Sequence, residues 1–129
     1  MKSASIAFAA ALALGAASWP MATLAQARVV SSSPAEGAVV SGPKVLALSF
    51  SEALAPATAG VSIVMTAMPG MANHGEMIIR NFTPGWSEGN RKLTLTLRQP
   101  LRAGTYEVRW QGAGADGHRV TGKVTFTVR

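Results

Sequence analysis

The sequence GTYEVRWQGAGADGHRVTGKVTFTV, residues 104–128, alternates large apolar side chains with polar ones on both sides of a glycine-rich segment. Tyr106, Val108 and Trp110 take every second position before that segment, and residues 124–128 repeat the pattern after it. Successive side chains of a strand point to opposite faces, so each half predicts a strand with one buried and one solvated face. Asp116-Gly117 is a favoured pair for the turn between two such strands. The stretch therefore predicts an antiparallel hairpin.

The same alternation recurs toward the N-terminus, at residues 45–50 and 92–98, after an opening strand near 28–33. Glycine and proline stand between these segments, where turns need them. About seven short strands in about 100 residues predict an all-β fold, a seven-strand Greek-key immunoglobulin-like sandwich or barrel. We also expect a short helical turn over residues 51–57 that Pro56 ends, Trp110 in the core, and Trp86 exposed in a loop.

The first 27 residues have the pattern of an export signal. A positive start at Lys2 is followed by an apolar run at 6–17 and a small-residue end at 25–27. A membrane anchor would need about 20 continuous apolar residues, and Pro20 interrupts a shorter run. We therefore expect a signal peptide at 1–27, cleaved after Ala25 or Ala27, and one soluble, exported domain at 28–129.

Composition removes several classes of function. The chain has no cysteine, so disulfides and zinc fingers are excluded. Its formal net charge is +6, but the basic residues are scattered and lack interleaved aromatic residues, which argues against nucleic-acid binding. No Ser-His-Asp set stands out, and the six acidic residues are too dispersed to suggest paired catalytic carboxylates. The chain is therefore predicted not to be an enzyme.

Four of the chain's six methionines lie in one short segment, MTAMPGMANHGEM at residues 65–77. Every third residue there carries a sulfur or imidazole donor: Met65, Met68, Met71, His74 and Met77. Core methionines would be dispersed over several strands. A helical stripe would need spacings near 3.6, and Pro69-Gly70 would break a helix. The pattern therefore favours a binding segment over packing alone.

Thioether sulfur is a soft, neutral ligand that favours Cu(I) over hard ions, and imidazole also suits copper. In an extended segment, residues three apart are separated by about 9–10 Å, too far to share one ion. The segment must therefore bend, and Pro69-Gly70 fits the second and third positions of a type II turn. We predict that three or four of the five donors bind one Cu(I), without choosing among them.

Several motifs are similar to those of one known family, the CopC family of periplasmic copper-binding proteins. The matching motifs are VVSSSPAEG at 29–37, LSFSE at 48–52, MTAMPGM at 65–71, GTYEVRW at 104–110, DGH at 116–118 and GKVTF at 122–126. The resemblance implies a cupredoxin-like β-sandwich in the periplasm that serves copper resistance or homeostasis. It also implies a Cu(I) site in the methionine segment and a partner, either a membrane copper transporter or another periplasmic copper protein. We expect a monomer.

Many members of that family also bind Cu(II) through a first-residue histidine together with an Asp and a His of the closing hairpin. Asp116 and His118 match the last two by position, whereas Gln26 or Arg28 stands where the histidine would be. Asp116 and His118 are therefore candidates for a weakened Cu(II) site. Glu52 and Glu107 are expected to be ordinary surface or sheet residues.

Two other functions remain open at this point. The first is an immunoglobulin-like interaction module whose methionine-rich loop docks a partner without any metal. The second is a copper oxidase or oxygenase with a histidine brace, against which the missing first histidine argues. Cu(I) binding under reducing conditions separates the carrier from the interaction module.

Overall fold

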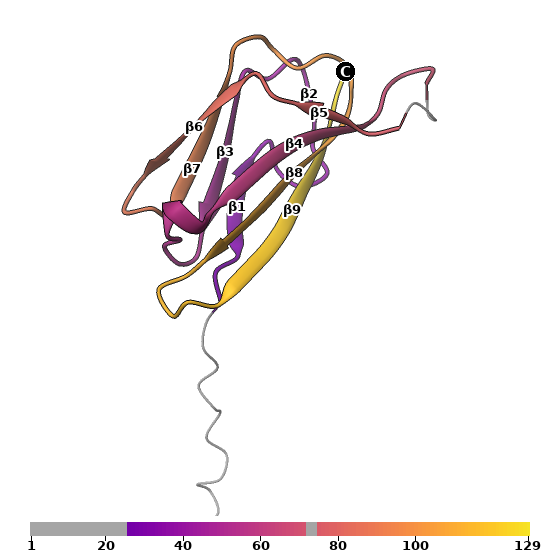
Figure 1. Cartoon of the computed structure of the whole chain (residues 1–129). Coiled ribbons are helices and arrows are strands. Elements are labelled where there is room, and N and C mark those ends of the chain that lie inside the picture. The colour runs from indigo at the N-terminus through magenta and orange to yellow at the C-terminus, as the bar shows by residue number, and fades with distance from the viewer. Residues whose placement is uncertain (1–25, 72–74) are drawn as a thin grey trace, which may run out of the picture.

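The computed structural model describes residues 26–71 and 75–129, and in them it has nine strands and one short 3-10 helix, η2 at Pro56–Thr58 (Figure 1). The strands are β1 (Val29–Ser33), β2 (Val39–Val40), β3 (Val45–Phe50), β4 (Gly60–Ala67), β5 (Met77–Ile79), β6 (Phe82–Ser87), β7 (Lys92–Leu97), β8 (Gly104–Ala113) and β9 (Arg119–Val128). They form a four-stranded sheet, ordered β1-β3-β7-β6, and a five-stranded sheet, ordered β2-β9-β8-β4-β5.

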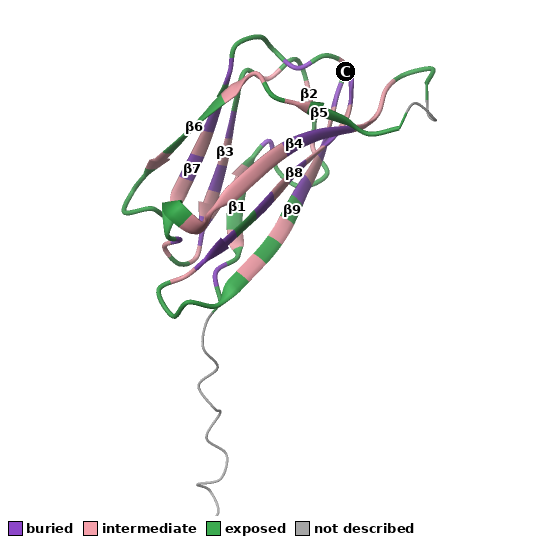
Figure 2. Ribbon diagram, viewed as in Figure 1, coloured by how far each residue is buried: buried purple, intermediate pink, exposed green. Residues whose placement is uncertain are grey.

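The hydrophobic core lies between the two sheets and is built from alternate residues of the long strands. On β8, Tyr106, Val108 and Trp110 are buried, and β3, β7 and β9 contribute in the same way (Figure 2). Burying one such side chain is worth about 1.5–3 kcal/mol. The period-two pattern of the sequence thus corresponds to one face of each strand packing inward.

Strands β8 and β9 form the predicted hairpin, registered from Gly104↔Val128 to Ala113↔Arg119. In its turn, the Gly117 N–H donates to the Gly114 carbonyl at 3.0 Å, and Gly117 has a φ of 81°. That left-handed conformation favours glycine, which explains the Asp-Gly pair.

The aromatic residues confirm one prediction and correct another. Trp110 is in the core, where its ring meets Phe50 edge-on with centroids 4.9 Å apart. Trp86 was expected in an exposed loop, but it lies in β6, is half-buried and stacks on Phe50 at 6.1 Å. Pro84-Gly85 suggested a loop, yet β6 is an edge strand, where a proline removes no hydrogen bond needed by a neighbouring strand.

The all-β two-sheet sandwich predicted from the sequence is confirmed, with two short strands beyond the expected seven. Strand β2 pairs parallel with β9, and β5 pairs antiparallel with β4. The expected helical turn is displaced: η2 begins at Pro56 instead of ending there. Proline suits the first turn of a helix because its missing N–H would have no partner there. Within residues 26–71 and 75–129, no helix has the length and apolarity to cross a membrane.

Candidate metal centre

Met65 and Met68 point to the same side of the five-stranded sheet, although they are three residues apart. Met65 pairs with Tyr106 and Ala67 with Thr105, so Thr66 is an extra residue with no partner on β8. Such a β-bulge reverses the alternation of faces. Both methionines consequently pack toward the core, and Met65 is only 3% exposed.

The predicted bend at Pro69-Gly70 is confirmed. The Met71 N–H donates to the Met68 carbonyl at 3.0 Å, and Gly70 has a φ of 76°. This is the pattern of a type II turn, in which glycine supplies the positive φ at the third position. The turn sets Met71 directly opposite Met68, as an isolated antiparallel bridge.

Strand β5 returns the chain to β4 and sets Met77 directly opposite Met65. Residues directly opposite in an antiparallel pair have Cβ atoms about 4.5–5.5 Å apart and share one face of the sheet. The four methionines therefore form two facing pairs, Met65 with Met77 and Met68 with Met71. Met77 is 47% exposed and Met71 53%, so the group extends from the core to the surface.

His74, the fifth predicted donor, lies outside the described residues. The ligand role of all five residues stays a prediction, because convergence of strands does not by itself demonstrate coordination. What the arrangement offers chemically is a group of soft, uncharged sulfur donors at one end of the sandwich.

Gly104 supports this arrangement and was not identified from the sequence as part of the site. A Cβ at position 104 would lie 3.0 Å from the Met65 Cε and 2.7 Å from the Ala67 carbonyl oxygen. The lack of a side chain at Gly104 thus leaves the room that Met65 occupies. No sequence signal marks this role, because it depends on a contact across the sheet.

Asp116 and His118, the second pair of candidates, are brought together in the β8–β9 turn. The Asp116 Oδ2 lies 3.0 Å from the His118 Nδ1, and the His118 backbone N–H donates to the Asp116 Oδ1 at 2.9 Å. These bonds, the backbone one first, lower the pKa of the Asp116 carboxyl below its ordinary value. A lowered pKa favours the charged carboxylate, which is the form that can bind a metal ion.

A cavity of about 250 Å³ beside this pair is also lined by Gln26 and Glu52. Glu52 was expected to be an ordinary surface residue; it is exposed, as expected, but it faces the same cavity as Asp116 and His118. In the parts of the chain that the structure describes, no three His, Asp or Glu side chains are grouped closely enough to hold a metal ion.

A larger hollow of about 630 Å³ on the five-stranded sheet, beside Arg109 and Lys123, has no Met, His, Asp or Glu in its lining.

The fold and the methionine group together define a small two-sheet β-sandwich with a candidate soft-metal site at one end. The CopC domain family matches residues 29–129, and the chain belongs to this family. This confirms the resemblance seen in the sequence motifs.

Named relatives agree with this assignment. Copper resistance protein C of Pseudomonas syringae pv. tomato is 42% identical over 118 residues, which cover 90% of this chain and 92% of that protein. Copper resistance protein C of Xanthomonas campestris pv. juglandis is 36% identical, with 81% of each chain covered. The crystal structure of PcoC, a methionine-rich copper resistance protein from Escherichia coli, has a TM-score of 0.72 and 32% identity, covering 81% of this chain and all of that one. Membership of this family confirms that the chain is not an enzyme.

Proposed function

We propose that the protein is a periplasmic copper carrier that holds one Cu(I) among Met65, Met68, Met71, His74 and Met77. The observation that carries the proposal is the pairing of the methionines. A bulge, a turn and a short ladder set four methionines of one short segment in two directly opposite pairs. Cysteine is absent from the chain, so thioether sulfur is its only soft donor, and thioether favours Cu(I).

The relatives support copper as the ion. The Pseudomonas syringae relative is named copper resistance protein C, and the similar Escherichia coli structure is described as that of a methionine-rich copper resistance protein. Because this chain has its own methionines in facing pairs, copper is the natural ion for it too.

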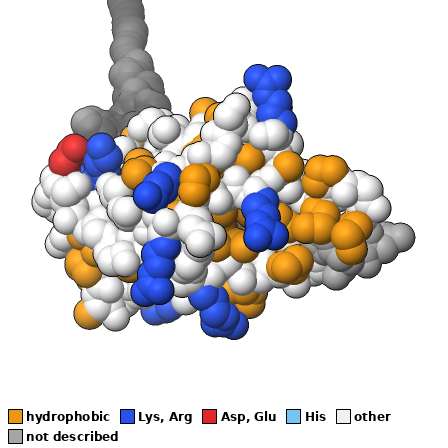
Figure 3. Space-filling model, turned by 90° about the horizontal axis from the view of Figure 1, so that it is seen from above, with side chains coloured by type: hydrophobic (Ala, Val, Ile, Leu, Met, Phe, Trp, Pro, Cys, Tyr) orange, Lys and Arg blue, Asp and Glu red, His pale blue; other side chains and the backbone are white. Residues whose placement is uncertain are grey.

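The gradient of burial in the methionine group suits a carrier. Met65 is buried, whereas Met71 and Met77 are about half exposed, so a ligand of a receiving protein can replace an outer thioether while the inner one still holds the ion. Apolar side chains gather there beside the undescribed residues, with Lys and Arg side chains near them (Figure 3). We propose that a monomer exchanges copper with a membrane copper transporter or another periplasmic copper protein.

Of the two cleavage positions for the signal peptide, the packing supports cleavage after Ala25. Ala27 is 8% exposed and belongs to the core. The Ser51 N–H donates to the Arg28 carbonyl at 2.8 Å, and the Arg28 N–H donates to the Ser51 Oγ at 3.1 Å. Cleavage after Ala27 would remove a buried residue and turn the Arg28 N–H into a charged amine.

Cleavage after Ala25 also has a consequence for the second metal site. The new terminal amine would belong to Gln26, which lines the cavity shared with Asp116, His118 and Glu52. We propose that this amine, Asp116 and His118 form a weak Cu(II) site. Nitrogen and oxygen donors suit Cu(II).

The test of the carrier proposal is a Cu(I) titration under reducing conditions, with a chromophoric chelator as competitor. Wild-type protein should bind about one Cu(I) per chain, and a variant with Met65, Met68 and Met71 changed to Leu should bind far more weakly. Leucine fills nearly the same space as methionine, so the sandwich should persist. If the variant competes for Cu(I) as well as wild type does, the carrier proposal fails and an interaction module becomes the better account.

A further inference from the structure

Strand β5 is too short to hold its own register. It has three residues and, among the described residues, pairs only with β4, through Ile63↔Ile79, Val64↔Ile78 and Met65↔Met77. Three residue pairs at the edge of a sheet make a short ladder, below the usual strand length of about five or six residues. Since β5 lies at the edge of the sheet and carries Met77, a contact at its start would help to keep Met77 opposite Met65.

Glu76, the residue immediately before β5, makes such a contact with the central strand β8. The Arg109 Nη2 donates to the Glu76 Oε2 at 2.7 Å, and the Arg109 Nη1 donates to the Glu76 Oε1 at 3.3 Å. A bidentate guanidinium–carboxylate pair fixes orientation as well as distance. Because β4 lies between β8 and β5, this ion pair reaches over β4 and connects the start of β5 to β8.

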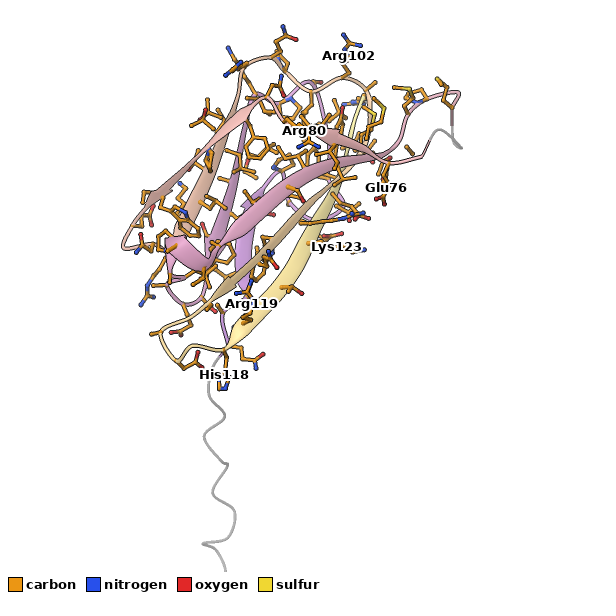
Figure 4. All side chains as sticks on the ribbon, viewed as in Figure 1. Glu76, Arg80, Arg102, His118, Arg119 and Lys123 are labelled. Atoms are coloured by element: carbon orange, nitrogen blue, oxygen red, sulfur yellow. The ribbon has the colours of Figure 1, made fainter. Side chains whose placement is uncertain are left out.

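Arg109 is itself held in place. Its Nε donates to the Glu107 Oε1 at 2.9 Å, and the Lys123 Nζ lies 3.6 Å from the Glu107 Oε2. The Glu107 side chain is only 17% exposed, so this end of the network is sheltered from solvent. Figure 4 shows Glu76 and Lys123 on the same side of the molecule. The network lies on the outer face of the sheet, whereas Met65 and Met68 pack toward the core.

We propose that Arg109 is a positioning residue of the Cu(I) site: through its ion pair with Glu76 it holds the start of β5, and so keeps Met77 opposite Met65. This inference rests on the proposed Cu(I) function. Among the described residues, the Arg109 guanidinium bonds to Glu76 and Glu107, so Arg109 acts through the strand that carries Met77.

The substitution Arg109→Gln separates positioning from simple electrostatics. Removing a positive charge near a bound cation would by itself tighten Cu(I) binding. Positioning predicts the opposite, a loss of affinity of about three- to tenfold, since a bidentate pair in a network exceeds the usual contribution of a surface ion pair. Lys123→Gln is the matched control, because it removes a positive charge from the same network but not the contact to Glu76. It should stay within about twofold of wild type.

A double-mutant cycle shows whether Arg109 acts through Met77. In a Met77→Leu background, Arg109→Gln should have almost no further effect on Cu(I) affinity. Arg109→Lys keeps the charge but loses the bidentate geometry, so it should weaken binding and serves as the second variant if Arg109→Gln does not fold. Wild-type affinity or tighter binding in the folded Arg109 variant, or an undiminished loss in the Met77→Leu background, would overturn the inference.

Amide hydrogen exchange of the copper-free protein distinguishes a failure of this inference from a failure of the proposed function. Arg109→Gln should speed exchange in β5 at least severalfold while exchange in β7 stays unchanged, because only β5 loses its brace. If wild type binds no Cu(I), the proposed function fails, whether or not hydrogen exchange in β5 changes. If wild type binds Cu(I) and exchange in β5 is unaltered by Arg109→Gln, only the positioning role fails.

Discussion

Met65 and Met71 have the same side chain but very different surroundings. Met65 packs among core residues and faces Gly104, whereas Met71 lies at the surface after a tight turn. An inner donor should hold the ion and an outer donor should govern its exchange. The roles of these two residues can therefore be separated by single substitutions.

Met65→Leu should lower Cu(I) affinity strongly, by about tenfold or more, and should cost less than about 1.5 kcal/mol of unfolding free energy because the volume is nearly conserved. Met71→Leu should leave stability unchanged and should speed the transfer of Cu(I) to a competing thioether ligand, because the incoming ligand no longer has to displace the outer thioether. Chelator competition, urea unfolding and stopped-flow transfer measure the three quantities. Equal transfer rates in wild type and Met71→Leu would contradict the assignment of Met71 as the exchanging donor.

The bulge at Thr66 explains why a spacing of three residues works on a strand. In a regular strand, Met65 and Met68 would point to opposite faces, and only one of them could reach a site on the inner face. The extra residue opposite β8 brings both to the inner face. The spacing of three residues therefore places both methionines on one face only because the strand contains the bulge at Thr66.

Deleting Thr66 should restore the alternation and turn Met68 to the outer face. We expect a loss of Cu(I) affinity of at least about tenfold, with the circular dichroism of a β-sandwich retained. Thr66→Ala is the control, because it keeps the bulge and removes only a hydroxyl that donates to the Thr105 carbonyl at 3.4 Å. Unchanged Cu(I) affinity after the deletion would show that Met68 is not among the ligands.

Elements with a repeating pattern could be predicted from the sequence, and elements defined by their partners could not. Period-two alternation was sufficient to predict the strands β3, β7, β8 and β9. The preferences of proline and glycine in turns were sufficient to predict the bend at Pro69-Gly70. The bulge at Thr66 exists only relative to β8, and β5 is too short to show any period. The contact between Glu76 and Arg109 joins residues 33 apart in the sequence, which no local signal encodes.

The two candidate copper sites lie at opposite ends of the sandwich. Met65 is opposite Tyr106, near the start of β8, whereas Asp116 and His118 follow its end at Ala113. His118 lies at one end and Arg80 and Arg102 at the other (Figure 4). At about 3.3 Å per residue, β8 separates the two sites by roughly 20 Å or more, so they should act independently.

His118→Ala should abolish any one-equivalent Cu(II) spectrum and leave the Cu(I) affinity within about twofold of wild type. The reason is that His118 is the one histidine within residues 26–71 and 75–129, while the methionines lie beyond the length of β8. Electron paramagnetic resonance follows Cu(II), and chelator competition follows Cu(I). An unchanged Cu(II) spectrum would remove Asp116 and His118 from the second site.

Whether thioether sulfur surrounds the ion is the question on which the whole account depends. X-ray absorption at the copper edge, recorded on protein loaded with one equivalent of Cu(I), answers it directly. We predict a first shell that contains at least two sulfur neighbours and loses sulfur when Met65 and Met68 become Leu. A shell of nitrogen and oxygen alone, the same in wild type and variant, would contradict the account.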